Sequence, residues 1–300
     1  LSDFVANQIF RSLKFNTKEI RVADPALGDG ELLFSLCRLL NERSNTKVIA
    51  DGFDIDLAAV EKAKSKINEI SSIEQNIIHG DFSEYVLSQR TNTLFEQHSP
   101  VLYDAVIANP PYVRTQVLGS EKSQELTKQF NLSGRVDLYH AFILGIASLL
   151  KADGILGIIV SNRFMTTKSG EGIRKNILEL FDLIHVWDFG DTQLFEAAVL
   201  PAVLLLKKKS NTNYDHKTKF TSIYSVKSSS NLTRTNNLFE SINSEGVIDV
   251  NEKGLYNVQQ GTLDHNGTMG GVWRLSNNNV DDWIQKVNAH TYMRFSDIGK

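Results

Sequence analysis

The residues with the clearest potential for chemistry are the four at positions 109–112, "NPPY", which follow the apolar run "YDAVIA". The chain contains only 5 prolines, so two adjacent prolines at one point indicate a loop whose conformation is restricted. The side chain of Asn109 and the backbone of Pro110 offer two carbonyl oxygens. Tyr112 offers a flat ring on which a planar substrate can stack.

This combination suits methyl transfer to an amino group that is attached to an aromatic ring. Such an amine is a poor nucleophile because its lone pair is delocalised into the ring. Two acceptors aimed at its hydrogens favour a pyramidal nitrogen and stabilise the positive charge that develops during attack. Holding the amine and the methyl donor in line is worth about 7–11 kcal/mol in the best model systems. The reaction needs no metal ion. Taken in isolation, the four residues are better explained as a stiff turn after a buried strand.

An earlier loop, "ADPALGDGELL", predicts a place for the methyl donor. Gly28 and Gly30 allow the backbone to approach a ligand closely, and the helix that follows offers free amide groups at its start. Asp24 precedes the glycines, with Ala26 in the same loop, and its charge favours a cationic ligand over a pyrophosphate. An ordinary tight turn also explains this loop when it is considered alone.

Two further strand ends complete the predicted cofactor pocket. Asp54, in "GFDID", follows the glycines at about the spacing at which nucleotide-binding folds place a carboxylate on ribose hydroxyls. In "HGDF", Asp81 can accept a hydrogen bond from an adenine amino group, and Phe82 can cover the adenine face. Together with the glycine loop they describe a pocket for an adenosine with a cationic tail and no pyrophosphate. The predicted cofactor is therefore S-adenosylmethionine.

The elements that must position these residues alternate between strands and helices. Seven strands are predicted, in "EIRVAD", "KVIADGFDID", "NIIHGDF", "YDAVIANPPY", "ILGIIVSN", "LIHVWDFG" and "AVLPAVLLLKK". Helices are predicted between them, at 31–43, in "LAAVEKAKSKINEI", in "VDLYHAFILGIASLLK" and at about 169–181. Near-continuous apolar strands that alternate with helices predict an α/β fold with a doubly wound, mostly parallel seven-stranded sheet of the S-adenosylmethionine-dependent methyltransferase type. Ligands of such sheets bind beyond the carboxyl ends of the strands, where the residues above lie.

The composition changes after about residue 210. Residues 1–210 hold all of these motifs and are predicted to form the catalytic domain, whereas residues 211–300 are richer in Ser, Asn, Gly and Thr. We expect 211–300 to be an extension that leads toward a target-recognition domain missing from this chain. The start at Leu1 and the abrupt end after "MRFSDIGK" are expected of an excerpt from a longer protein.

Bulk composition excludes several classes of protein. The net charge of −3 lacks the basic excess of a freestanding nucleic-acid binder, so any nucleic-acid contact must come from a local patch or from protein outside this chain. The single cysteine, Cys37, excludes an intrachain disulfide and a thiolate metal cluster. The 7 histidines show no metal-ligand spacing. The chain lacks a signal peptide and an apolar run long enough to span a bilayer, so we expect a cytoplasmic protein without a membrane partner.

With these motifs, the chain resembles the gamma class of N6-adenine DNA methyltransferases, which includes the TaqI methylase and the Type IIG restriction–modification enzymes. The resemblance covers nearly all of residues 1–210 and follows the motif order of that class. It rests on "DPALGDG", "FDID", "GDF", "NPPY", "DLYHAFILGIASLLKADG", "VSNRF" and "DFGDTQLFEAAVLPAVLLL". The resemblance implies methyl transfer from S-adenosylmethionine to the exocyclic amine of a flipped-out adenine in double-stranded DNA, as part of a restriction–modification or phage-defence system.

The resemblance also implies two aromatic site residues and several partners. Phe142 would line the adenine pocket of the cofactor, and Phe195 would pack against the displaced adenine opposite Tyr112. Each of these phenylalanines is otherwise explained as a core residue. The class usually has a Thr-Pro pair before its first helix, and this chain lacks it. A specificity domain or subunit, and a nuclease, are expected outside this chain.

Two other functions remain open at this stage. One is a methyltransferase that acts on a protein glutamine or on a guanine amine of ribosomal RNA. The other is a non-catalytic subunit that binds cofactor or DNA and regulates a partner. The long segment 113–136, the second aromatic residue Phe195 and the apparent truncation favour DNA methylation. The intact "NPPY" argues against a non-catalytic role.

Overall fold

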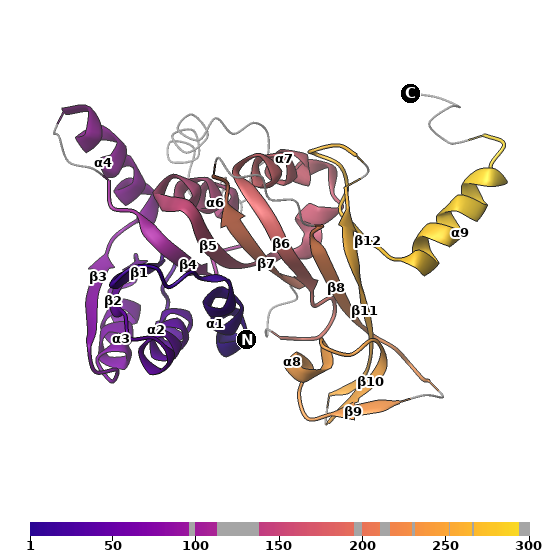
Figure 1. The fold of residues 1–300 in the computed structure, drawn as a ribbon, viewed down its shortest axis with the longest axis horizontal. Coiled ribbons are helices and arrows are strands. Elements are labelled where there is room, and N and C mark those ends of the chain that lie inside the picture. Colours follow the sequence, from indigo (N-terminus) through magenta and orange to yellow (C-terminus); the bar gives the residue numbers. More distant parts are fainter. Residues whose placement is uncertain are drawn as a thin grey trace.

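The computed structural model of the chain is a twisted sheet with helices packed on both faces (Figure 1). The structure describes residues 1–95, 100–112, 138–194, 200–210, 217–229, 232–251, 253–265 and 267–293. Within these residues the sheet has twelve strands.

Five parallel strands form the half of the sheet that carries most of the predicted site residues. In spatial order β3-β2-β1-β4-β5, their bounds are Ile73–His79, Lys47–Asp54, Glu19–Asp24, Tyr103–Ala108 and Leu150–Ser161. The chain runs outward from β1 to β3 and then returns to place β4 on the other side of β1. The strand order therefore reverses between β1 and β4, which is where ligands bind in doubly wound sheets.

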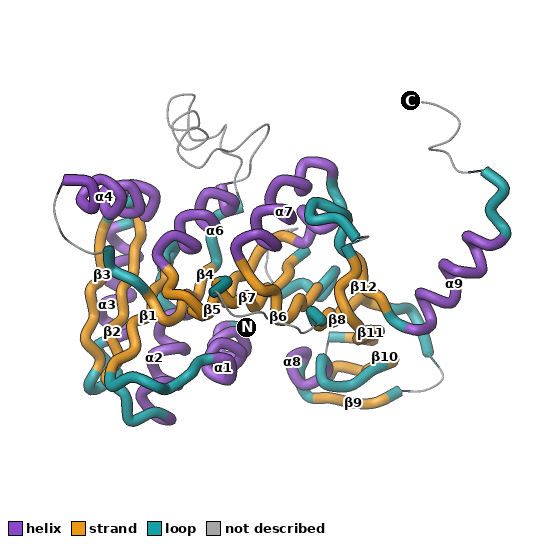
Figure 2. Tube along the Cα trace, turned by 45° about the horizontal axis from the view of Figure 1, so that its top comes forward, coloured by secondary structure: helices purple, strands orange, loops and turns teal. Residues whose placement is uncertain are grey.

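The helices cover the two faces of this half separately (Figure 2). One face carries helices α1, α2 and α3, with bounds Ser2–Ser12, Glu31–Arg43 and Leu57–Ile67. The other carries α4, α6 and α7, with bounds Phe82–Phe95, Leu138–Leu149 and Glu171–Leu180. None of the helices that the structure describes is long and apolar enough to cross a bilayer. The predicted doubly wound α/β fold is confirmed.

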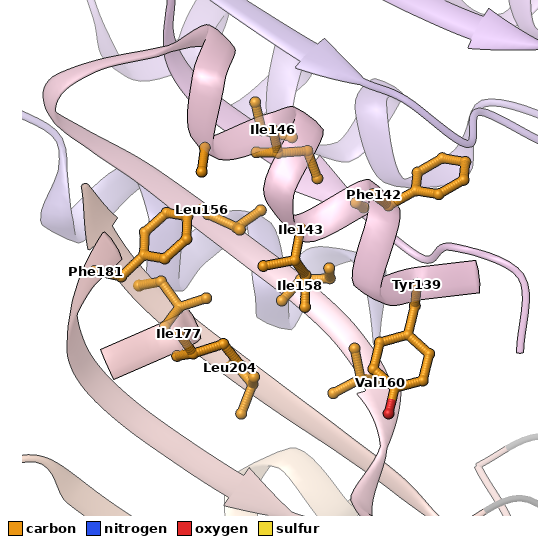
Figure 3. Packing of buried hydrophobic residues seen from close by; sticks show 14 of the residues in the cluster. Tyr139, Phe142, Ile143, Ile146, Leu156, Ile158, Val160, Ile177, Phe181 and Leu204 are labelled. Carbon is orange, nitrogen blue, oxygen red and sulfur yellow. The ribbon is translucent and has the colours of Figure 1, made fainter. Parts of the chain in front are cut away.

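The buried core explains why the central strands are apolar along their whole length. In β5, Leu156 and Ile158 point to the face covered by α6 and α7, where Figure 3 shows them in one cluster with Ile143. Ile155 and Ile159, which alternate with them, pack in the cluster on the opposite face. Because successive side chains of a strand point to opposite faces, a strand covered on both sides needs apolar residues at every position.

The last two predicted strands both lie in the sheet, and one of them is antiparallel to its neighbours, as a mostly parallel sheet allows. Strand β7 (Pro201–Lys208) lies between β5 and β6 (Phe181–Asp188) and is antiparallel to both. The segment "ADG", from which the sequence predicts a turn at the end of the helix in "VDLYHAFILGIASLLK", lies inside β5, where the register against β4 shifts and Asp153 has φ +64°. Helix α4 was not predicted from the sequence.

The sheet continues beyond residue 210. Strand β8 (Lys219–Ser225) pairs in parallel with β6, and β11 (Gly254–Asp264) pairs antiparallel with β8. The outermost elements are β9 (Thr233–Thr235), β10 (Gly246–Val250), β12 (Arg274–Ser276), α8 (Leu238–Ser241) and α9 (Asn278–Ala289). The domain boundary at residue 210 stays a prediction.

One buried carboxylate ties the first four strands together. Asp51, on β2, has a side chain that is 4% exposed. It accepts hydrogen bonds from the side chains of Arg21 on β1 (3.0 Å), Asn76 on β3 (2.9 Å) and Tyr103 on β4 (2.9 Å). A buried charge is tolerated only when such partners compensate for lost hydration.

We expect Asp51→Ala to lower the free energy of unfolding by about 3 kcal/mol, because it leaves the buried Tyr103 hydroxyl without its acceptor and the partly buried Arg21 guanidinium without its counter-charge. Urea denaturation measures this change. The control is Glu61→Ala, which breaks the exposed Lys64–Glu61 pair and should cost less than about 0.5 kcal/mol. Equal losses in the two variants would contradict a structural role for Asp51.

Candidate functional site

A cavity of about 340 Å³ opens at the carboxyl ends of β1 to β4 and extends to the start of α6. Its volume is at the lower end of the range for small-molecule sites. The predicted residues that line it are Ala26, Gly28, Asp54, Asp81, Phe82, Asn109 and Phe142. Strand ends that are far apart in the sequence therefore meet around one space.

The first loop places a buried carboxylate behind the cavity wall. Asp24 is fully buried, and its Oδ1 accepts a hydrogen bond from the backbone N–H of Ala26 at 3.0 Å. Its Oδ2 has no hydrogen-bond partner among the residues that the structure describes. Burial raises the pKa of Asp24 to about 7, with a smaller contribution from the nearby charge of Asp54. An open, buried carboxylate oxygen favours a ligand with a positive charge.

The two glycines of this loop are needed for different structural reasons. Gly28 lines the cavity with φ +53°, and its N–H donates to Asp54 Oδ2 at 2.7 Å. Gly30 has φ +80° at the start of α2, where a Cβ would lie 2.8 Å from the Cβ of Ala63 on α3. Close packing of α2 on α3 therefore explains Gly30, which does not line the cavity.

The two strand-end acids are oriented by backbone hydrogen bonds. Asp54 accepts from Gly28 N–H and also from Asp56 N–H at 2.8 Å, so it joins the loops after β1 and β2. Asp81 accepts from Ser83 N–H at 2.7 Å, at the start of α4. A carboxylate has about four acceptor positions, so Asp54 can hold both backbone groups and still accept from ribose hydroxyls.

Aromatic rings form one wall of the cavity. Phe82 and Phe142 stack with ring centroids 5.5 Å apart and an interplanar angle of 27°. Phe53 packs edge-on against Phe82 at 5.6 Å and also lines the cavity, although the sequence analysis did not identify it. Its position directly before the acid at a strand end was the signal that could have revealed it. A wall of this kind suits a purine, which has large apolar faces.

The "NPPY" loop contributes Asn109 and Pro111 to the cavity, and Pro110 is buried. The hydroxyl of Tyr112 donates a hydrogen bond of 2.5 Å to Asn109 Oδ1. Burial raises the pKa of Tyr112, which keeps this hydroxyl protonated and able to donate. The bond fixes the Asn109 amide, whose oxygen retains a second lone pair for a substrate amine.

Some predicted residues lie outside the described part of the chain. Phe195 and the segment 113–136 are among them, so their predicted roles stay predictions. Other cavity-lining residues were missed by the sequence analysis: Pro25, Ile55, Gly80, Ser83 and Leu138. The described residues contain no group of three or more His, Cys, Asp or Glu side chains arranged to hold a metal ion.

Comparison with known proteins gives one family and several relatives. The Eco57I restriction-modification methylase family model matches residues 31–195. The Type II methyltransferase M.BanIII of Aneurinibacillus aneurinilyticus is 37% identical over 317 residues, which cover 99% of this chain and 53% of that protein. The chain thus spans about half the length of this curated relative.

Solved structures show the same fold at lower identity. A class I S-adenosylmethionine-dependent methyltransferase from Listeria monocytogenes superimposes with a TM-score of 0.58 at 18% identity, covering 73% of this chain and 63% of that one. The type IIG restriction endonuclease BpuSI superimposes with a TM-score of 0.58 at 16% identity, covering 96% of this chain and 33% of that one.

These comparisons confirm the predicted fold type and support the predicted cofactor, S-adenosylmethionine. The family match extends from α2 through the loops of Asp54, Asp81 and Asn109, so it includes three of the four strand ends that form the cavity. The chain belongs to the Eco57I restriction-modification methylase family.

Proposed function

We propose that this chain transfers a methyl group from S-adenosylmethionine to the exocyclic amine of a flipped-out adenine in double-stranded DNA, within a restriction–modification or phage-defence system. The observation that carries the proposal is that Asn109 lines the same cavity as Asp54, Asp81 and Phe82. The amine acceptor is thus adjacent to the pocket of the methyl donor. The relationship to M.BanIII, a Type II methyltransferase, supports DNA as the substrate.

The cavity fits the cofactor on chemical grounds. S-adenosylmethionine, when bound, supplies an electrophilic methyl group on a sulfonium. The open oxygen of Asp24 suits its cationic amino-acid end, and Asp54 suits the ribose hydroxyls. The stacked rings of Phe82 and Phe142 suit the adenine. The amino group of the adenine would donate a hydrogen bond to the Asp81 carboxylate.

Asn109 and Pro110 would act on the substrate amine. The Asn109 carbonyl and the backbone carbonyl of Pro110 accept the two amine hydrogens, which favours a pyramidal nitrogen and stabilises the charge that develops there. The hydrogen bond from Tyr112 holds the Asn109 oxygen in place before the substrate arrives. Tyr112 would also stack on the flipped base, with Phe195 on the opposite side, and so offset part of the unstacking cost.

The remaining assignments follow from this function. We place the catalytic domain at residues 1–210 and treat residues 211–300 as the connection to a target-recognition domain. A specificity domain or subunit, and a nuclease, would lie outside this chain and would supply phosphate-binding surface that the net charge of −3 does not offer.

Incubation of the full-length protein with methyl-labelled S-adenosylmethionine and a mixture of unmethylated DNA, RNA and protein tests the function directly. We expect the label in DNA, and after digestion to nucleosides we expect it on the exocyclic amine of adenine. Label in RNA or protein without label in DNA would reject the proposal in favour of a guanine or glutamine substrate.

Asn109→Ala should lower the rate of methyl transfer by about a hundredfold to a thousandfold, because it removes one of two acceptors at the reacting nitrogen. Cofactor affinity, measured by calorimetry, should stay within about threefold of the wild type because the other cavity walls remain. Asn7→Ala, on the exposed surface of α1, is the matched control and should change neither quantity. A loss of cofactor affinity that accounts for the whole loss of rate would instead assign Asn109 to cofactor binding.

Asp24 should make the stability of the cofactor-free protein depend on pH. Its pKa is raised from 3.8 to about 7, so the native state holds the proton more tightly than the unfolded chain. The stability from this group is present at low pH and is lost as pH rises through about 7, by up to about 1.4 kcal/mol per pH unit.

Thermal unfolding of the wild type and of Asp24→Asn between about pH 4.5 and about pH 8 isolates this effect. The wild type should lose stability relative to the variant as pH rises, and S-adenosylmethionine should reduce the difference because it brings a cation to the carboxylate. Parallel pH profiles for the two proteins would show that Asp24 does not titrate in this range.

A further inference from the structure

A second cavity, of about 520 Å³, opens at the carboxyl ends of β5, β6 and β8. Strands β4 and β5 are parallel neighbours, so this cavity lies at the same edge of the sheet as the "NPPY" loop. It is lined by the residues that follow β5, by Asp188 at the end of β6, by part of β8, and by Trp273 and Arg274. None of the residues that line the cofactor cavity belongs to it.

A buried arginine fixes the walls of this second cavity. Arg174, on α7, is 3% exposed, and its guanidinium donates to the carbonyls of Phe164, Thr167 and Gly270. The two 3-10 turns after β5, Asn162–Met165 and Lys168–Gly170, are thereby fastened to the turn that precedes Trp273.

Further contacts hold the same two segments together. The backbone N–H of Trp273 donates to the carbonyl of Met165 at 2.9 Å, and its ring packs edge-on against Phe164 at 5.3 Å. These contacts therefore hold the cavity residues near 163 and near 273 at fixed positions relative to one another.

The group left without a partner in this cavity is a donor. Trp273 is 2% exposed, and its indole Nε1–H has no partner among the described residues. Arg274, by contrast, is paired with two carboxylates, with Asp264 through Nη2 and with Asp281 through Nη1 at 3.7 Å. Buried donors without acceptors are rare in native structures and indicate a missing partner.

The carboxylate of the cavity is already occupied. Asp188 accepts from the Asn162 side chain at 2.8 Å, from the hydroxyl of Tyr224 at 2.7 Å and from Gly190 N–H at 3.1 Å. A cation would therefore find no open oxygen on Asp188 comparable to the one that Asp24 offers. The exposed guanidinium of Arg163 adds a positive charge at the rim. The open indole donor and this charge favour a ligand that brings acceptors and negative charge.

The remaining lining selects among anions. Met165, Phe220 and Leu275 give the cavity apolar walls beside the Trp273 ring, so a bare inorganic anion would leave most of the space unfilled. A nucleotide combines acceptor atoms on its base, an apolar sugar face and a phosphate. DNA that delivers an adenine to Asn109 would pass close to this cavity, because the cavity begins at β5, the strand next to β4, and neighbouring strands lie only about 4.8 Å apart.

We propose that this second cavity binds a nucleotide of the DNA next to the target adenine, with an acceptor atom of the nucleotide on the open indole N–H of Trp273 and a phosphate on Arg163. The proposal rests on the proposed action on DNA. It assigns a DNA contact to Trp273, which lies in the part of the chain that the sequence predicted to be an extension.

The indole N–H resonances of the full-length protein, labelled with ¹⁵N-tryptophan, test the proposal. Phenylalanine variants assign the signals, and duplex DNA is added at low salt, where phosphate-driven binding is strongest. We expect the Trp273 indole proton to move downfield as it gains an acceptor. Trp187, buried on the opposite face of the sheet, should not move. Inorganic phosphate at the same phosphate concentration should leave Trp273 unchanged.

Arg163→Gln provides a second readout. We expect KM for DNA in the methyl-transfer assay to rise about tenfold and the salt dependence of DNA binding to weaken by about one unit of slope. Lys175→Gln, which removes an exposed lysine of α7 paired with Glu179, is the matched control and should change neither.

The outcomes separate this inference from the proposed function. If DNA saturates the protein and is methylated while the Trp273 signal stays fixed, the cavity does not hold a nucleotide and the inference is wrong. A Trp273 shift with inorganic phosphate equal to that with DNA would also overturn it, because the site would then be a simple anion site. A Trp273 shift with DNA but without adenine methylation would keep the cavity and reject the methylation proposal.

Discussion

The hydrogen bonds to the Asp51 carboxylate are the interaction on which the position of the cofactor cavity depends. Side chains of β1, β3 and β4 all donate to this one residue of β2, within the buried sheet. Three residues further along β2, Asp54 ends the strand and orients the loop after β1 through Gly28. The alignment that Asp51 enforces in the sheet is therefore carried to the strand ends, where residues from four strand ends and from α6 must meet within one cavity of about 340 Å³.

Residue type together with position at a strand end was enough to predict much of this cavity. Asp54, Asp81 and Phe82 each follow a recognisable apolar strand, so periodicity alone brought them to one edge of the sheet. Contacts between segments that are distant in the sequence could not be predicted in this way. The Asp51 hydrogen bonds link positions up to 52 residues apart, and nothing local in the sequence pairs them. Gly30 shows a second limit, because a glycine required by helix packing looks the same in a sequence as one required by a ligand.

The same reasoning explains why residues after 210 were read only as an extension. Their Ser-, Asn- and Gly-rich composition is typical of a linker, and composition does not reveal strand pairing. In the structure, β8 pairs with β6 and brings β11 and β12 into the same sheet. Trp273 then packs against Phe164, more than a hundred residues earlier, and its backbone bonds to Met165. A cavity whose walls come from such separated segments is visible only once the sheet is complete.

The two cavities, at one edge of the sheet, favour ligands of opposite charge. Behind the first, Asp24 leaves an acceptor open and favours a cation. In the second, Trp273 leaves its indole donor open beside the charge of Arg163, which favours an anion. Strand β4 lies between β1 and β5 in the sheet, so Asn109 follows the strand between Asp24 and the second cavity. A sulfonium donor and a polyanionic substrate would thus each be drawn to its own side of β4, and the amide of Asn109 would stand at the point where the two must meet.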